Sequence, residues 1–117
     1  MAAGYYDFEI EQGADFTLAV NYQDTASATI DLSTYSSGRM QIRESTESSS
    51  YVIELTTGNG RLSLDQSDPN ITLTLSNTET ASLDFDHAVF DLEIVASGGE
   101  VTKILRGNVK LKRDVTK

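Results

Sequence analysis

The sequence contains no cysteine and no tryptophan, and only one proline and one histidine in 117 residues. Without cysteine, the chain can form no disulfide, no thiolate-bound zinc site and no thiol-based catalytic centre. His87 is the single histidine, so a serine–histidine–aspartate triad would have to use it as the base. We therefore predict a protein that is not an enzyme and that has no cofactor. A metal-dependent hydrolase whose activity depends on His87 is the enzymatic alternative.

Long apolar runs are missing as well. No run approaches the roughly 20 residues that a helix needs to cross a bilayer. Residues 1–13 lack both the basic segment and the apolar segment of a secretory signal. We expect synthesis in the cytoplasm and no membrane partner. The length predicts a single domain, residues 1–117, that can bury a core without metal or disulfides.

Basic residues are scarce, with nine lysines and arginines against 18 carboxylates and a net charge of −9. Residues 1–102 hold only three of the nine, and residues 103–117 hold six. An acidic body repels phosphates, so we predict no nucleic-acid partner. The basic end could be a nucleic-acid arm, but Lys110 and Lys112 alternate with apolar residues, which favours the solvent face of a strand.

Apolar residues recur at every second position along most of the chain, which is the period of a half-buried strand. This pattern predicts strands at about residues 6–11, 16–22, 29–32, 39–43, 51–55, 62–64, 71–75, 87–96 and 100–112. In these strands Met40 and Ile42 are expected to face inward, as are Phe90, Leu92 and Ile94. Eight to nine short strands at close spacing predict an all-β sandwich or barrel.

Turn signals separate these strands. The segments Gly-Asn-Gly at residues 58–60 and Ser-Gly-Gly at residues 97–99 predict two hairpin turns. Residues 62–64 should therefore continue the ladder of residues 51–55. Gly107 predicts a bulge or bend in the last strand. The serine-rich segment 44–50 predicts an exposed loop, and residues 23–28, 33–38 and 65–69 read as a turn, a loop and a turn.

One helical turn is predicted within residues 76–83. Ser76 followed three residues later by Glu79 is the pattern of a capping box.

The first and last strands have outer faces of opposite charge. The first carries Asp7, Glu9 and Glu11, and the last carries Lys110 and Lys112. If the two strands lie side by side, opposite charges face each other across the ladder. We favour this pairing within one molecule; the alternative is pairing with a neighbouring copy, which would make a homo-oligomer. The candidate interface residues are Asp7, Glu9, Glu11, Lys110, Lys112 and Arg113.

Tyrosines are candidates for ligand contact. Tyr6 and Tyr51 lie in strand-like runs and are expected in the core or an interface, whereas Tyr5 and Tyr35 are better candidates for exposed contact. A carbohydrate-binding module using Tyr5, Tyr35 or the loop 44–50 is an alternative function, although the absence of tryptophan weakens it.

Two carboxylate clusters could hold Ca²⁺ by composition: the pair Asp84 and Asp86, and the group Asp65, Asp68 and Asn70. Neither has the spacing of an EF-hand loop, and aspartates in turns commonly cap the local backbone. We therefore predict no metal site.

Five segments of the chain carry a family resemblance. They are residues 9–24 (EIEQGADFTLAVNYQD), 30–43 (IDLSTYSSGRMQIR), 55–65 (LTTGNGRLSLD), 71–85 (ITLTLSNTETASLDF) and 90–116 (FDLEIVASGGEVTKILRGNVKLKRDVT). Together they resemble small β-sandwich structural proteins of tailed bacteriophages. Phe90 stands where tyrosine is common in that family, and residues 103–105 read Lys-Ile-Leu where Arg-Leu-Leu is common.

The resemblance covers essentially the whole chain and rests on structural motifs. It implies an immunoglobulin-like antiparallel sandwich and a place in the virion, in the tail, baseplate or fibre-attachment region, among other virion proteins. It carries over no catalytic residue. A capsid surface (decoration) protein is the alternative within the same setting.

Overall fold

Strands make up most of the described chain, which comprises residues 4–23, 30–65 and 70–115 of a computed structural model. The strands are β1 (Gly4–Tyr5), β2 (Phe8–Glu11), β3 (Phe16–Val20), β4 (Tyr35–Arg43), β5 (Ile53–Thr56), β6 (Leu62–Leu64), β7 (Ile71–Leu75), β8 (His87–Ala96) and β9 (Val101–Lys112). One short helix, α1 (Asn77–Ala81), lies between β7 and β8.

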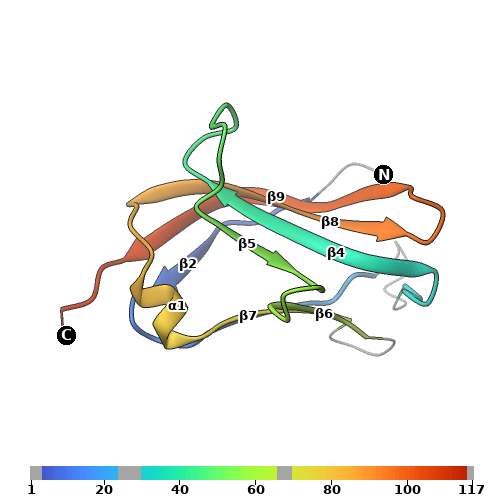
Figure 1. The fold of residues 1–117 in the computed structure, drawn as a ribbon, viewed down its shortest axis with the longest axis horizontal. Coiled ribbons are helices and arrows are strands. Elements are labelled where there is room, and N and C mark those ends of the chain that lie inside the picture. Colours follow the sequence, from blue (N-terminus) through green and yellow to red (C-terminus); the bar gives the residue numbers. More distant parts are fainter. Residues whose placement is uncertain (1–3, 24–29, 66–69, 116–117) are drawn as a thin grey trace.

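The strands form two sheets that lie one above the other (Figure 1). The larger sheet has the order β1-β9-β8-β4-β5, with β2 also paired to β9, and the smaller sheet has the order β3-β7-β6. All pairings are antiparallel except those of β1 and β2, which run parallel to β9.

This strand order is that of an immunoglobulin-like sandwich. Strands β9, β8, β4 and β5 take the positions of strands G, F, C and C′, while β3, β7 and β6 take those of B, E and D. The disulfide and buried tryptophan typical of antibody domains are absent, since the chain has neither residue type. The predicted all-β, immunoglobulin-like sandwich is confirmed; its two parallel N-terminal pairings were not predicted.

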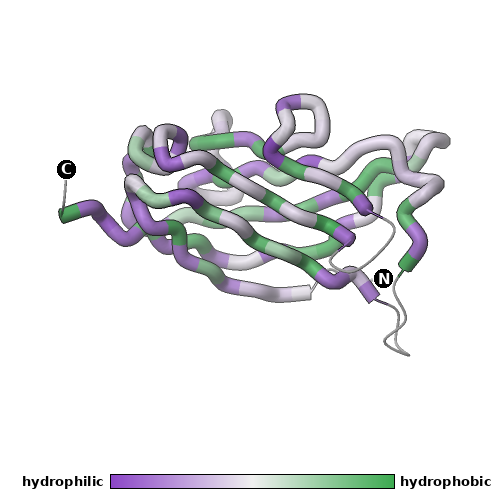
Figure 2. Tube along the Cα trace, turned by 90° about the horizontal axis from the view of Figure 1, so that it is seen from below, coloured by the Kyte–Doolittle hydropathy of each residue, from purple (hydrophilic) through white to green (hydrophobic). Residues whose placement is uncertain are grey.

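The core lies between the sheets and comes from the inward positions of both. Along the strands of Figure 2, hydrophobic residues alternate with hydrophilic ones. Met40, Ile42, Leu92 and Ile94 expose no more than 1% of their surface, so the inward positions are as predicted. Burying each such side chain stabilises the fold by roughly 1.5–3 kcal/mol.

The turn at residues 58–60 does not make a hairpin. It connects β5 in the larger sheet to β6 in the smaller sheet, and β6 pairs with β7 instead. The Asn59 side chain accepts hydrogen bonds from the backbone N–H groups of Thr56 and Arg61 and thereby holds the turn. A tight turn is compatible with either outcome, because it reverses the chain without deciding which strand lies beside it.

Gly107 does not mark the bulge in β9. The register between β8 and β9 shifts between Leu92 and Glu93, which oppose Leu105 and Lys103, so Ile104 is the extra residue. Gly107 is needed for a different reason: a Cβ atom there would collide with the backbone carbonyl of Tyr6. The glycine therefore lets the N-terminal segment lie against β9.

The start of β4 also differs from expectation, since β4 begins at Tyr35 inside the predicted loop 33–38. Residues 30–32 form no strand, and the predicted turns at 23–28 and 65–69 lie largely outside the described residues. Tyr35 is half-buried against the core, so it is not the exposed residue that we predicted. Tyr6 and Tyr51 are about half exposed, at 47% and 49%, and are not core residues.

The predicted helical turn is confirmed as α1. Ser76 is its N-cap, and the reciprocal hydrogen bonds between Ser76 and Glu79 form a capping box. Asp15 accepts a further hydrogen bond from the backbone N–H of Asn77, at 2.8 Å, which ties the helix to the segment before β3.

The predicted hairpin turn at residues 97–99 connects β8 to β9, which pair with each other. Gly99 has φ +94° in this turn.

Candidate functional site

The first and last strands pair within one molecule, as predicted. In the β2–β9 ladder Glu9 lies opposite Lys110, and Glu11 lies opposite Lys112. The Lys112 Nζ atom is 3.9 Å from a carboxylate oxygen of Glu9, and both side chains are about half exposed. We call this row of four residues the charged stripe. Its opposite charges already face each other in the folded monomer.

The other predicted interface residues lie beside the stripe and are also engaged. Asp7 accepts hydrogen bonds from the backbone and the side chain of Asn108, at 2.9 and 3.2 Å. Arg113 forms ion pairs with Asp84 and Asp86, at 2.9 and 3.3 Å, which raise the pKa of its guanidinium. The structure therefore brings the predicted interface residues together around the stripe, where most of them meet partners in the same chain.

The carboxylate clusters considered for Ca²⁺ have other partners in the structure or lie partly outside the described residues. Asp84 and Asp86 share Arg113, a cation that competes with any metal. Asn70 is fully buried, and its side chain bonds the backbone of Tyr22 and Ile30. Asp68 lies outside the described residues. No group of three or more potential metal ligands is found among the residues described.

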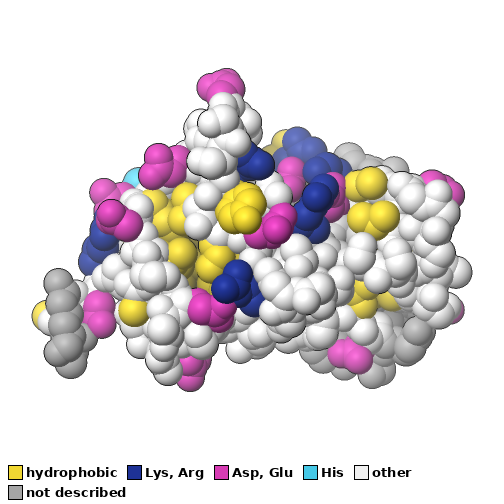
Figure 3. All heavy atoms as spheres, viewed as in Figure 1, with side chains coloured by type: hydrophobic (Ala, Val, Ile, Leu, Met, Phe, Trp, Pro, Cys, Tyr) yellow, Lys and Arg dark blue, Asp and Glu magenta, His cyan; other side chains and the backbone are white. Residues whose placement is uncertain are grey.

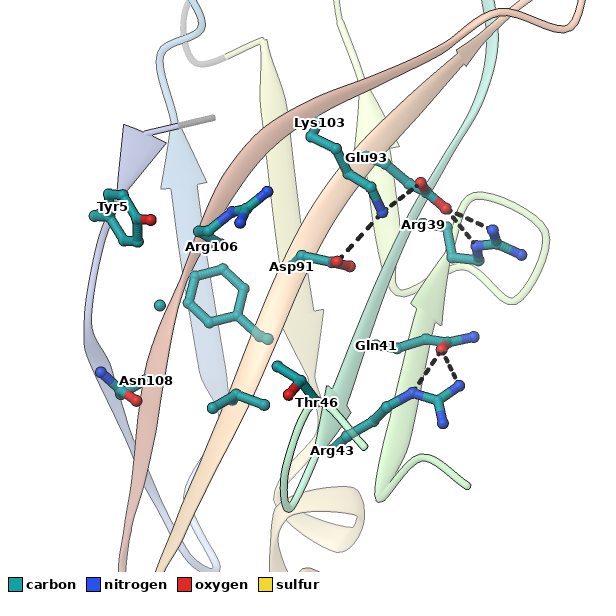
Figure 4. A pocket seen from close by; sticks show the side chains of 13 residues that line it. Tyr5, Arg39, Gln41, Arg43, Thr46, Asp91, Glu93, Lys103, Arg106 and Asn108 are labelled. Carbon is teal, nitrogen blue, oxygen red and sulfur yellow. Dashed lines mark hydrogen bonds and ion pairs between the residues drawn. The ribbon is translucent and has the colours of Figure 1, made fainter. Parts of the chain in front are cut away.

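The outer face of the larger sheet carries a shallow hollow of about 480 Å³, which we call the charged groove (Figure 4). Strands β1, β4, β8 and β9 form it, together with Thr46 of the β4–β5 loop. Its lining residues are Tyr5, Arg39, Gln41, Arg43, Thr46, Val89, Phe90, Asp91, Glu93, Lys103, Arg106, Gly107 and Asn108. The loop that includes Thr46 projects from the molecule, and an acidic side chain lies at its tip (Figure 3).

Cross-strand register arranges the lining residues in rows. The upper row of Figure 4 runs from Lys103 through Glu93 to Arg39. A second row runs through five strand positions, in the order Tyr5, Arg106, Asp91, Gln41 and Glu54. Because neighbours in a row are only about 5 Å apart at Cβ, each side chain can reach the next.

Glu93 is the buried centre of the upper row. Its side chain is 7% exposed, whereas those of Arg39 and Lys103 are 52% and 43% exposed. The Arg39 Nε and Lys103 Nζ atoms each lie 2.9 Å from the Glu93 carboxylate. Lys103 also reaches Asp91, at 3.2 Å. Together with Asp91 of the second row, the upper row forms an ion-pair network of two cations and two carboxylates whose charges cancel.

The pKa values of this network follow from its geometry. Burial alone would raise the pKa of Glu93, but hydrogen bonds from Lys103 and Arg39 outweigh burial and hold the pKa below its usual value. Burial would likewise lower the pKa of Lys103, yet Glu93 and Asp91 raise it overall. All three groups therefore stay charged near neutral pH, and the row is an electrostatic support without a titrating acid or base.

Arg43 lies in the same groove but has only neutral partners among the described residues. Its Nε and Nη2 atoms both donate to Oε1 of Gln41, at 3.2 and 2.7 Å, and Nη1 donates to the carbonyl of Ser48 at 2.8 Å. Gln41 is held in turn by its amide, which donates to Glu54 at 2.6 Å. The guanidinium is thus fixed in position while its charge lacks an ion-pair partner there.

Arg106 is an exposed cation of the groove, and its side chain makes no hydrogen bond or ion pair with any residue that the structure describes. Its neighbours across the ladder are Tyr5 and Asp91. Tyr5 is 82% exposed, and the Asp91 carboxylate is taken by Lys103. The predicted contact residue Tyr5 is therefore at this groove, next to an available cation, and Tyr35 does not line it.

His87 lies away from these features. It is exposed at the start of β8, opposite Lys110, and it does not line the groove.

None of the helices in the described part of the chain has the length and apolar character needed to cross a bilayer.

Sequence reasoning missed the groove. The signal was present in part, because Arg39, Gln41 and Arg43 alternate with inward residues on one strand, as Asp91 and Glu93 do on another. Within its own strand, each set of residues indicates only the polar half of the alternation. Nothing local indicates that these two strands are neighbours, so their charges could not be combined.

No protein-family model matches the chain, and no curated protein sequence matches it significantly. Among solved structures, it is similar to murine CRIg, with 13% identity over 92% of each chain and a TM-score of 0.43.

Proposed function

We propose that this chain is a non-enzymatic structural protein of a tailed-phage virion, located in the tail or baseplate, which acts by binding other virion proteins. The resemblance of residues 9–116 to such proteins supports the setting. The chain would be made in the host cytoplasm and incorporated into the virion there.

The observation that carries the assembly role is that the charged groove is open and is lined by several charged side chains. Sites for small molecules are mostly enclosed and apolar, with few polar groups. The groove is instead spread across strands β1, β9, β8 and β4 and includes arginines and an exposed tyrosine. Arginine and tyrosine are the residue types enriched at protein–protein contacts. Strands also position these side chains more rigidly than loops would.

The charged stripe is the second surface for assembly. Its residues are exposed, but each acidic position already faces a basic one on the neighbouring strand. A partner at this stripe would have to compete with those internal pairs. The groove, with two cations that lack an acidic partner among the described residues, is therefore the surface that we favour.

The test is to purify, by density gradient, the virions of the phage whose genome encodes this chain. We expect the chain to co-purify with the virions. In electron micrographs, a gold-labelled antibody against the chain should bind at the tail. Gold over the capsid would favour the decoration role instead. A chain that is abundant in infected cells but absent from purified virions would overturn the proposal.

A carbohydrate-binding module is the second candidate, because Tyr5 is 82% exposed beside Arg106 and lines the same groove as the loop residue Thr46. A glycan array with the purified chain tests it. Glycan binding that disappears on Tyr5→Ala but persists on Tyr51→Ala, a matched exposed tyrosine outside the groove, would favour this function.

A further inference from the structure

The described part of the chain contains cations that meet no carboxylate, although carboxylates outnumber basic residues two to one in the sequence. Within the described residues, Arg43, Arg106 and Lys110 have no ion pair with an acidic side chain. Lys110 belongs to the charged stripe, in which two lysines face two glutamates, whereas the lining of the charged groove holds four cations and only two carboxylates. Arg43 and Arg106 both line the charged groove. Unbalanced positive charge is therefore concentrated at one place on an acidic protein.

We propose that the charged groove binds an acidic peptide segment of a partner protein, whose carboxylates pair with Arg43 and Arg106. The inference rests on the proposed function only for the identity of the partner, a neighbouring virion protein. The chemistry of the groove itself names the ligand class.

The two guanidiniums offer different kinds of contact. Arg43 is held by Gln41 and Ser48, and Glu54 holds Gln41, so little conformational freedom is lost when a carboxylate binds. Arg106 is exposed and makes no side-chain contact of this kind within the described chain, so its whole donor edge is open. A guanidinium can donate two parallel hydrogen bonds to a carboxylate, which makes arginine well suited to this ligand.

The rest of the groove selects against other anions. Asp91 lies opposite Arg106, the Glu93 network lines the same groove, and the chain carries a net charge of −9. A polymer with one phosphate per residue would place charges over these carboxylates and be repelled. A peptide can instead place acidic side chains at the two arginines and neutral ones over Asp91. Tyr5 at the edge provides an apolar ring with a polar tip for the peptide backbone.

The probe is a capped synthetic peptide of about ten residues in which glutamate alternates with glycine, titrated into the ¹⁵N-labelled full chain and followed by NMR. We expect a dissociation constant of about 1 mM or tighter at low salt. The shifts should centre on the groove, including the side-chain Nε–H signals of Arg43 and Arg106. Affinity should fall at high salt, because the arginine charges that attract the peptide are then screened.

Variants separate this site from general charge attraction. Arg106→Gln should weaken binding about threefold or more without changing the fold, because its side chain has no partner among the described residues. Adding Arg43→Gln should remove binding. Lys110→Gln is the matched control, since it removes one exposed cation outside the groove, and its affinity should stay within about twofold of the unmodified chain.

Three results would overturn the inference: equal binding of the peptide with glutamine in place of glutamate, an equal loss on Lys110→Gln, or tighter binding of polygalacturonate oligomers than of the peptide. The last would assign the groove to an acidic glycan. The peptide titration and the virion experiment can fail independently. If the chain is present in virions but the peptide does not bind to the groove, the proposed function stands and the peptide site is rejected. Peptide binding by a chain absent from virions does the reverse.

Discussion

The two outer faces of the sandwich arise from the same alternation and differ in charge. The outward strand positions of the smaller sheet are all uncharged: Thr17, Ala19, Ser63, Thr72 and Thr74. The outward positions of the larger sheet carry the charged groove and its buried Glu93. Both faces leave the inward positions free to form one core. A sheet therefore does not require charge on its outer face, and the charges of the groove are consistent with the proposal that it binds a partner.

We call the outer face of the smaller sheet the threonine-rich face. The charged groove depends on a backbone contact that this face does not have. Strand β1 lies against β9 only because Gly107 leaves room for the carbonyl of Tyr6. This contact places Tyr5 at the edge of the groove. Substitutions that disturb this contact should therefore destabilise the protein more than substitutions on the outer face of the smaller sheet.

Gly107→Ala should have the largest effect. Its new methyl group meets backbone that cannot rotate away, so β1 must move, at a cost of about 2–3 kcal/mol in the free energy of unfolding. Chemical denaturation measures this cost, and NMR should show Tyr5 displaced while the threonine-rich face is unchanged. Gly58→Ala is the control, because the nearest atom to its new methyl is Thr56 Oγ1 at 3.7 Å. Equal losses in the two variants would contradict the steric argument.

Glu93→Gln should be next, at about 1–2 kcal/mol near neutral pH. The change leaves Arg39 and Lys103 without their shared carboxylate, but both cations are partly exposed, which reduces the cost below that of a fully buried pair. The folded pKa of Glu93 is depressed, so its contribution is complete above the ordinary glutamate pKa of about 4.3 and is lost as the pH falls through the folded pKa.

Denaturation curves at several pH values check this prediction. The two proteins should differ most at neutral pH and converge in strong acid. Glu47→Gln, which removes one carboxylate from the exposed loop, is the control and should change stability by less than about 0.5 kcal/mol at neutral pH. A constant gap between the Glu93 variant and the unmodified chain down to strong acid would show that packing, and not charge, is responsible.

Reversing both lysines of the charged stripe, Lys110→Glu with Lys112→Glu, should cost about 1 kcal/mol. Like charges would then face each other at Glu9 and Glu11 across the β2–β9 ladder. Light scattering should find the same mass for the unmodified chain at low and high salt, because the stripe is paired internally. Adding Glu9→Lys and Glu11→Lys should restore stability. Unchanged stability with a smaller mass in the double variant would instead place the stripe between copies.

Thr74→Val should have the smallest effect, within about 0.5 kcal/mol, and should leave peptide binding at the groove unchanged. The side chain is exposed on β7 opposite Thr17, and valine is equally suited to a strand. Denaturation and the NMR titration check both points. A loss of peptide binding in this variant would mean that the two outer faces are coupled and do not act independently.

Much of the fold could be predicted from local patterns. The alternation around Met40 and Phe90 located the strands, Ser76 and Glu79 marked the helix, and the opposite charges at the two ends suggested their pairing. The candidate site was harder to predict. Tyr5 was a candidate contact residue and does line the groove, but Arg43 and Arg106 were not candidates, because their importance depends on which carboxylates lie near them.

By itself, the sequence determined which residues face inward, because a strand turns successive side chains to opposite sides and apolar groups leave water wherever that pattern allows. The tertiary structure alone decided that β6 joins the smaller sheet, that Gly107 serves the approach of Tyr6, and that Arg43 and Arg106 share one groove. These outcomes depend on contacts between residues far apart in the chain. Such contacts are set by how the two sheets pack as a whole, and no local pattern encodes them.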